Sequence, residues 1–306
     1  VVLPGTQRSV DADEKVTFRI ATLAPRGSTW MRVINAWKNS LEERTEGRVT
    51  LQVFPGGSQG DEADFVEKMG SGQIARPVLV LQAPGVIGSY GQIDRVRTRL
   101  ASRFDGLFES EGYKLLGWGD AGEARLFSKA PIRRPSDLRN VTPWAWSDDP
   151  LFGKFVTEAG GTPRQLGLPE VLPALQTGMI DAVPASALAA VSLQWFNQTN
   201  HVTEQASGII VGATVLKKDK FDALPADLQE AVMATASQAH TLLNRRIRAA
   251  DTRAFNTLKD LDRYTVVDTS AHRGEWQTVS NRVRDHFVGR IYSRELLSEV
   301  QRAAGN

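Results

Sequence analysis

The start of the chain alternates between strand and helix patterns, and this alternation limits the possible folds more than any other feature. Residues 16–21, VTFRIA, alternate apolar and polar side chains as a strand does. A helical pattern follows from about residue 29 to 45, with Ser28 as its cap. A second strand covers residues 48–54, and Asp61 opens another helix. Strand, helix, strand and helix in this order predict a mostly parallel α/β sheet.

The rest of the chain continues this mixture of elements. Residues 113–132 predict a strand, a glycine-rich turn and a second strand, and residues 144–146 belong to a short strand before a helix. After Phe221 one long helical pattern follows, with Pro225 near its start. The chain of 306 residues exceeds the roughly 100 to 200 residues of one domain, so we expect two domains.

One connection departs from this plan. The segment GSGQIARPVLVLQ passes from the expected end of a helix at Met69 directly into an apolar strand. Parallel strands are normally joined by a crossover of a dozen residues or more. We therefore expect a missing segment near residues 74–77. Either the protein lacks a strand there or residues are absent from the sequence, and the apolar edges that a lost strand would expose favour the second explanation.

Composition and spacing exclude several classes of function. The absence of cysteine excludes disulfides, thiolate metal sites and cysteine nucleophiles. Lys and Arg number 37 against 35 Asp and Glu, so the charge gives no reason to expect a nucleic-acid partner. The four histidines are scattered without metal-ligand spacing, and we expect them at the surface or at helix ends. The sequence shows no combination of a nucleophile, a base and a residue that orients the base, so we expect no catalysis. We also expect no metal and no cofactor.

Aromatic side chains gather at the predicted strand ends. Trp144 and Trp146 stand two residues apart in a strand, so both side chains project from one face. In open α/β sheets, ligands bind outside the carboxyl ends of the strands. We expect this pair to border a ligand site, whereas either indole taken alone fits a domain core equally well. The other aromatic candidates are Phe54, Trp118, Trp195 and Trp30.

Two charged motifs have a structural interpretation. Asp148 and Asp149 precede Pro150, where negative charge stabilises the start of a helix. Residues 244–253, NRRIRAADTR, form a basic run on the long helix, for which a solvated helix face is the default interpretation.

Four blocks, in order, resemble the periplasmic solute-binding proteins of tripartite ATP-independent (TRAP) transporters between about residues 16 and 243. They are LAPRGSTWMRVINAWKNSLEERTEGRVTLQVFPGGSQGDEADFVEKM, LLGWGDAGEARLFSKAPIRRPSDLR, LPEVLPALQTGMIDA and FDALPADLQEAV. The resemblance implies a two-domain α/β fold of the periplasmic-binding-protein type, class II-like, with hinge strands and a long interdomain helix. It divides the chain into a linker (1–15), mainly domain I (16–135), mainly domain II (136–220), and a long helix with C-terminal helices packing across both domains (221–306).

The same resemblance implies a function without catalysis. A protein of this kind captures a small molecule in the cleft between its domains and delivers it to TRAP membrane permease subunits. It implies a periplasmic location after removal of an export signal, with a lipid anchor upstream of Val1 left open.

Two positions depart from the family pattern. Counting from Leu138, the family arginine that clamps a ligand carboxylate corresponds to Trp144, and a family asparagine corresponds to Ala185. Burying a carboxylate without a partner is unfavourable, so these replacements predict a hydrophobic or amphipathic, lipid-like ligand. The sequence resembles a subgroup that lacks the arginine and works with a tetratricopeptide-repeat partner protein.

Three alternatives stay open. Arg125, in EARLF, matches a second basic position of the family and would bind an organic acid if it faces the ligand. An enzyme on a related scaffold would need a catalytic set that the sequence does not display. An adaptor would use exposed indoles to bind another protein.

Overall fold

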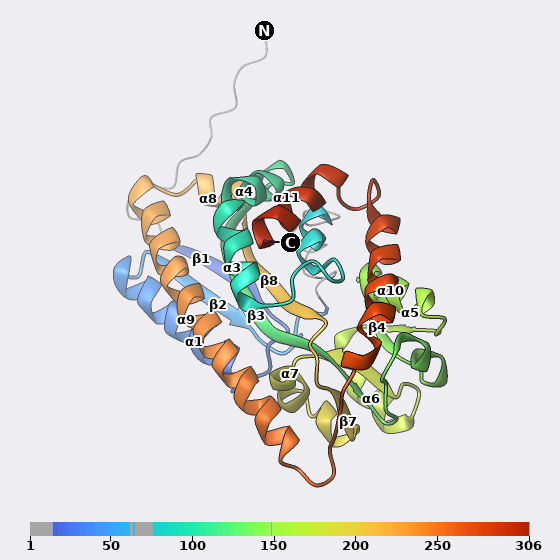
Figure 1. Cartoon of the computed structure of the whole chain (residues 1–306). Coiled ribbons are helices and arrows are strands. Elements are labelled where there is room, and N and C mark those ends of the chain that lie inside the picture. The colour runs from blue at the N-terminus through green and yellow to red at the C-terminus, as the bar shows by residue number, and fades with distance from the viewer. Residues whose placement is uncertain (1–14, 62–63, 65–75, 148, 306) are drawn as a thin grey trace.

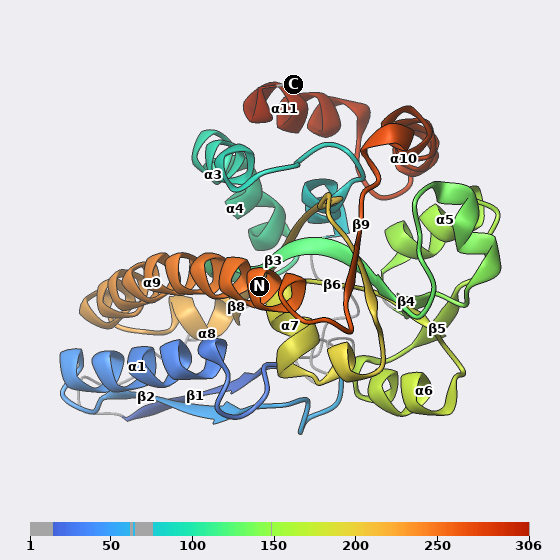
Figure 2. The same cartoon turned by 60° about the horizontal axis from the view of Figure 1, so that its bottom comes forward.

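The computed structural model describes residues 15–61, 64, 76–147 and 149–305. Most of the predicted linker, the helix expected after Asp61, the start of the suspected gap at 74–77, and Asp148 lie outside these residues. None of the helices in the described ranges combines the length and apolar character that a membrane span requires. The described chain folds into two lobes joined by β-strands and one long helix (Figures 1 and 2).

The first lobe begins with two parallel strands, β1 (Val16–Ala21) and β2 (Val49–Phe54), joined by α1 (Thr29–Arg44). This order confirms the prediction. The hydroxyl of Ser28 accepts a hydrogen bond from an amide of the first helical turn and so caps α1, as expected. Apolar residues of α1 pack on the strands and on the long helix α9 (Ala226–Lys259), which lies over α1 in Figure 2.

The apolar run that follows is not a strand. Arg76–Gln82 forms the 3-10 helix η1, which buries Val80 and Leu81 in a core shared with α3 (Tyr90–Arg99) and α4 (Ala101–Ser110). Periodicity cannot separate a buried strand from a buried helix in so short a run, and this prediction was wrong. Within the described residues, β1 pairs with β2 alone.

One long strand, β3 (Tyr113–Ser128), connects the two lobes. Its first part pairs antiparallel with β8 (Gly208–Lys217), and its end pairs antiparallel with β6 (Ala182–Ala185). The strand therefore continues through the residues predicted to form a turn, and that prediction was wrong. Two short strands, β7 (His201–Thr203) and β9 (Thr265–Val267), complete a five-stranded sheet around it.

The glycines of β3 allow α9 to approach instead of turning the chain. A Cβ atom at Gly117 would lie 2.4 Å from Cγ of His240 on α9, closer than van der Waals contact permits. Gly122 has φ of 115°, and a Cβ atom there would lie 2.7 Å from the carboxyl carbon of Asp251. Glycine is therefore required at both positions by the helix that crosses the strand.

The second lobe contains a parallel pair of short strands, β4 (Trp144–Trp146) and β5 (Arg164–Leu166), with α5 (Pro150–Glu158) and α6 (Val171–Thr177). The strand β4 and the helix α5 occur where the sequence predicts them. The carboxylate of Asp149 accepts hydrogen bonds from two amides of the first turn of α5, which confirms its helix-start interpretation.

The long helix α9, of 34 residues, runs beside β3 and packs on α1 and on α7 (Ala187–Ser192) (Figure 1). Beyond it, α10 (Arg273–Phe287) packs against α5, and α11 (Arg294–Ala304) packs against α3. The C-terminal segment thus contacts elements of both lobes, while the proposed domain limits stay a prediction. The other short elements are η2 (Pro135–Asn140), η3 (Leu168–Glu170), η4 (Trp195–Asn197), α8 (Lys218–Asp222) and η5 (Ser270–His272).

Candidate functional site

Three indoles gather in the second lobe, and we call Trp144, Trp146 and Trp195 the tryptophan cluster. The rings of Trp144 and Trp146 have centroids 6.2 Å apart, so both leave β4 on the same face, as predicted. Trp195, from η4, meets Trp144 edge to face with the centroids 5.3 Å apart. Two elements that are far apart in sequence therefore build one aromatic surface.

Two members of the tryptophan cluster belong largely to the lobe's interior. Trp144 is 3% exposed and Trp195 is 2% exposed, in a core that also contains Val171 and Leu175. Nε1 of Trp144 donates a hydrogen bond to the backbone oxygen of Leu166, at 3.0 Å, so the buried indole leaves no polar atom unpaired. The structure gives both rings a packing role, and their contact with a ligand stays a prediction.

Trp146 reaches across to the other lobe. Its indole Nε1 donates to Oδ2 of Asp61 at 2.9 Å, and the same oxygen accepts a hydrogen bond from the amide of Leu168 at 2.9 Å. Asp61 follows β2 in the first lobe, whereas Leu168 begins η3 in the second. This contact marks the place where the lobes meet. Sequence reasoning assigned Asp61 only to a helix start, although its position after a glycine-rich loop at the carboxyl end of β2 was a usable signal.

Arg125 lies beside Ala185, its partner in the register of β3 and β6. Its side chain is 8% exposed, and its guanidinium group pairs with Glu123 and donates to the backbone oxygen of Glu204 at 2.6 Å. The same group lies 3.9 Å from the ring centre of Phe255. Arg125 therefore has protein partners for its charge, and a carboxylate ligand would compete with Glu123.

Of the other three candidates, Trp118 and Trp30 pack in hydrophobic clusters separate from the one that holds the tryptophan cluster. Trp118 packs edge to face against Phe104 and Phe108 of α4, at centroid distances of 5.6 and 5.7 Å. Phe54 is half-buried at the end of β2, and Trp30 donates from Nε1 to the backbone oxygen of Asp120 at 3.2 Å. The ligand role of each of the eight predicted residues stays a prediction.

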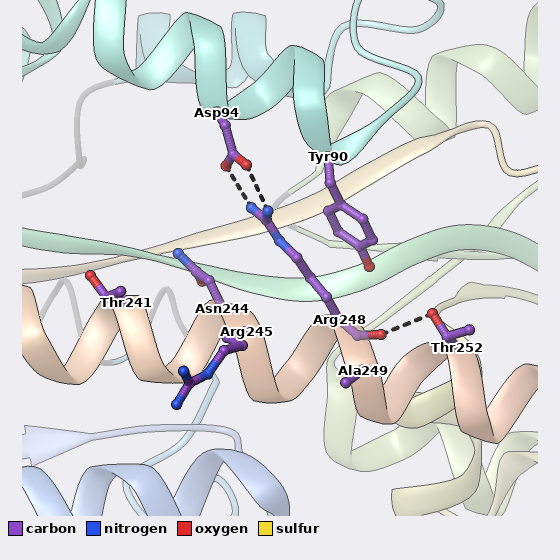
Figure 3. Close-up of a pocket in the computed structure, with 8 residues that line it drawn as sticks. All are labelled: Tyr90, Asp94, Thr241, Asn244, Arg245, Arg248, Ala249 and Thr252. Carbon is purple, nitrogen blue, oxygen red and sulfur yellow. Dashed lines mark hydrogen bonds and ion pairs between the residues drawn. The ribbon is translucent and has the colours of Figure 1, made fainter.

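A second polar region, which sequence reasoning missed, ties α3, β3 and α9 together. We call Asp94, Arg97, Asp120 and Arg248 the charge network. The buried carboxylate of Asp120 accepts from Nη1 of Arg97 at 2.7 Å and from Nε of Arg248 at 2.6 Å. The two Nη atoms of Arg248 hold Asp94 at 2.7 and 2.6 Å, as Figure 3 shows.

Hydrogen bonding and burial shift the pKa values in the charge network in opposite directions. The hydrogen bonds from Arg248 lower the pKa of Asp94, and those to Asp94 and Asp120 raise the pKa of Arg248. Burial lowers the pKa of Arg97, against the opposing charge of Asp120. The solvated face predicted for residues 244–253 was therefore wrong in part, because Arg248 points inward and finds acidic partners that are distant in sequence.

Two further side chains of α9 face inward. Asp251, 3% exposed, accepts hydrogen bonds from the amides of Glu123 and Leu188, each at 2.9 Å, and burial raises its pKa. It joins β3 and the start of α7 to the long helix. His240, expected at the surface, is 7% exposed and hydrogen-bonds to Thr214 Oγ1 at 2.8 Å, and burial lowers its pKa.

Two grooves border α9, and neither is lined by a predicted site residue. The larger, about 620 Å³, lies between α9 and α3 (Figure 3) and is lined by Tyr90, Asp94, Thr241, Asn244, Arg245, Arg248, Ala249 and Thr252. The smaller, about 360 Å³, lies between α9 and α1. Over the ranges that the structure describes, no group of three or more His, Cys, Asp or Glu residues could hold a metal ion.

Comparisons with known proteins point to one family. Residues 20–290 match the model of the family described as bacterial extracellular solute-binding protein, family 7. A solute-binding protein of Sulfitobacter sp. (strain NAS-14.1) is 21% identical over 97% of this chain and 94% of that protein. The ectoine/5-hydroxyectoine-binding periplasmic protein of Ruegeria pomeroyi is 26% identical over 71% of this chain and 68% of that protein. A TRAP periplasmic solute-binding protein from Shewanella oneidensis, solved with bound succinate, has a TM-score of 0.86 at 16% identity, over 95% of this chain and 99% of that chain.

Proposed function

Because the chain belongs to family 7 of the bacterial extracellular solute-binding proteins, we propose that it is the solute receptor of a TRAP-type secondary transporter. In this role it captures a small molecule between its lobes and delivers it to membrane permease subunits. Proteins of this family are receptors, so the family assignment argues against the enzyme alternative. Closure of the lobes around the ligand is the motion that such a fold uses.

We propose that the ligand is hydrophobic or amphipathic. The observation that carries this proposal is the tryptophan cluster at the meeting of the lobes, with Trp146 bonded to Asp61 of the other lobe at 2.9 Å. An indole beside this meeting place offers a large apolar face and one donor, which suits a ligand with an apolar body and a polar end. The charge of Arg125 is balanced by Glu123, which supports the same proposal.

The test is the chemistry of the bound solute. We would extract the purified, denatured protein with organic solvent and identify the extract by mass spectrometry, beside a mock purification. A lipid-like or other amphipathic molecule in near-stoichiometric amount supports the proposal. A small hydrophilic acid in its place would refute the hydrophobic assignment. If the extract is empty, a thermal-shift screen of the two ligand classes decides in the same way.

The second candidate is an organic acid bound through Arg125. Two observations favour it: Arg125 lies opposite Ala185 in the sheet register, and the Shewanella oneidensis receptor of the same fold was solved with succinate. Arg125→Gln would then abolish stabilisation by small acids while leaving stabilisation by apolar solutes. Equal loss for both classes would indicate a structural role for the arginine.

The location of the receptor and its partner protein follow from the same proposal. A periplasmic location fits delivery to a membrane permease, and a tetratricopeptide-repeat partner fits a receptor that lacks the clamping arginine. Co-purification of the receptor with such a protein tests the proposed partner. The co-purification should be lost when residues at the interface of the two proteins are substituted. An adaptor role would require that truncation of Trp144 and Trp146 abolish protein binding but leave solute binding intact.

A further inference from the structure

The solvent side of α9 carries exposed arginines that lie outside the tryptophan cluster. Arg245, Arg246 and Arg253 are exposed on this helix, and Arg32 of α1 lies beside them. They line the smaller groove, of about 360 Å³, which adjoins the groove of Figure 3. The residues that line the smaller groove are Thr29, Arg32, Arg245, Arg246, Ala249 and Arg253.

The protein does not neutralise this charge within its described residues. Arg32 donates to the backbone oxygen of Gly27 at 2.7 Å and to the Thr29 hydroxyl at 2.8 Å, both uncharged acceptors. None of the four groove arginines forms an ion pair in the described part of the chain. By contrast, Arg248 on the inner side of the same helix has two carboxylate partners. A concave surface lined by one sign of charge concentrates the opposite charge.

The spacing of the arginines indicates the size of the missing partner. Arg245, Ala249 and Arg253 are four positions apart and lie along one line of the helix. At about 1.5 Å per residue, the two outer positions are about 12 Å apart. An extended peptide of about four residues covers this length and brings an acidic side chain within reach of each of the two arginines. The small side chain of Ala249 leaves the floor of the groove open between them.

We propose that this groove binds an acidic segment of a partner protein, with several Asp or Glu residues in extended conformation. Guanidinium groups match carboxylates in shape and charge, and four of them along a groove suit a row of acidic side chains. The concave shape favours an inserted peptide over a flat membrane surface. This inference stands apart from the identity of the solute, because the groove lies on the side of α9 away from the tryptophan cluster and shares no residue with it.

The experiment measures fluorescence anisotropy of a labelled hexaglutamate peptide, with hexaglutamine as the uncharged control, at low ionic strength. The test variant is R245E/R246E/R253E. The matched control is R133E/R273E/R302E, which reverses three exposed arginines outside α9 and changes the net charge equally. We expect hexaglutamate binding to the wild type and to the matched control, and a loss of about tenfold or more in the groove variant. Binding should weaken as salt is added.

Several outcomes would overturn the proposal. Equal loss in both triple variants would mean that net charge alone attracts the peptide. Groove-dependent binding of phosphatidylglycerol vesicles or of inorganic pyrophosphate, without peptide binding, would assign the groove to a lipid surface or to a small anion. Because charge reversal can disturb folding, R245Q/R246Q/R253Q is measured as well, and circular dichroism must be unchanged. Retained peptide affinity in this folded neutral variant also contradicts the proposal.

Discussion

The charge network and the tryptophan cluster both join distant parts of the chain, but they use different contacts. In the charge network, the carboxylate of Asp120 holds Arg97 and Arg248 at 2.7 and 2.6 Å and is out of contact with solvent. The tryptophan cluster reaches the other lobe through one carboxylate, that of Asp61, which accepts hydrogen bonds from Trp146 and Leu168. The first region ties α3, β3 and α9, whereas the second lies where the lobes meet.

This difference indicates which region moves. Separating a buried ion pair leaves a charge without a partner and is strongly unfavourable. Two hydrogen bonds to a carboxylate are exchanged for hydrogen bonds to water at much lower net cost. We therefore expect the charge network to stay intact while the lobes open, and the contacts of Asp61 to form and break.

Asp120→Ala should have the largest effect and tests the fixed side of the comparison. Arg97 is 9% exposed and would lose its carboxylate partner, so we expect the free energy of unfolding to fall by about 3–5 kcal/mol. Urea unfolding at neutral pH measures this change. Asp61→Ala is the matched variant, because it removes the hydrogen bonds of Asp61 to Trp146 and Leu168. An equal loss of stability in both variants would break the distinction between the two regions.

Gly117→Ala tests the close packing of α9 on β3 beside the charge network. The new Cβ atom would meet the ring of His240 at 2.4 Å, so we expect a loss of about 1–3 kcal/mol in the free energy of unfolding. Gly106, exposed in α4, is the control, because a Cβ atom there would meet none of the described residues within 4 Å. Gly106→Ala should stabilise the helix by about 0.5–1 kcal/mol. If both substitutions raise the free energy of unfolding, His240 of α9 does not lie this close to Gly117.

Elements that follow from local patterns were predicted from the sequence. The capped helix α1, the strands on either side of it and the long helix α9 depend on periodicity and capping, which neighbouring residues determine. The glycines of β3 misled the prediction because glycine suits both a turn and a close approach. Only the position of α9 separates these two uses, and residues far along the chain determine that position.

The candidate site divides in the same way. The shared face of Trp144 and Trp146 follows from strand geometry and was predicted. The partners of Arg248 were not, because Asp94 and Asp120 precede it by 154 and 128 residues. A basic run in a sequence does not reveal which of its members turns inward until the fold brings acidic groups to it.

Trp146→Ala tests the movable side of the comparison. If the ligand packs on this indole, the substitution should weaken solute binding by about 1–3 kcal/mol, as measured by isothermal titration with the solute identified from extracts. Trp146→Phe keeps an aromatic ring but loses the donor to Asp61, so its affinity should lie between those of the wild type and Trp146→Ala. Unchanged affinity in both variants, together with lower stability, would make Trp146 a packing residue like Trp144.

Asp94→Asn should have the smallest effect and sharpens the picture of the charge network at its exposed edge. The hydrogen bonds from Arg248 lower the pKa of Asp94 in the folded protein, so its carboxylate stabilises the fold above the ordinary value of 3.8. This contribution is lost as the pH falls through the lower, folded-state pKa. The Asp94 side chain is 50% exposed, so we expect a loss of less than about 1 kcal/mol in the free energy of unfolding near neutral pH.

The difference in the free energy of unfolding between Asp94→Asn and the wild type should be smaller in acid than at neutral pH. Urea unfolding at neutral pH and at a pH below the folded-state pKa of Asp94 measures this difference. Asp262→Asn, at an exposed position, is the control. A difference that grows in acid would contradict the role given to Arg248, because a carboxylate with a lowered pKa can only lose its contribution on protonation.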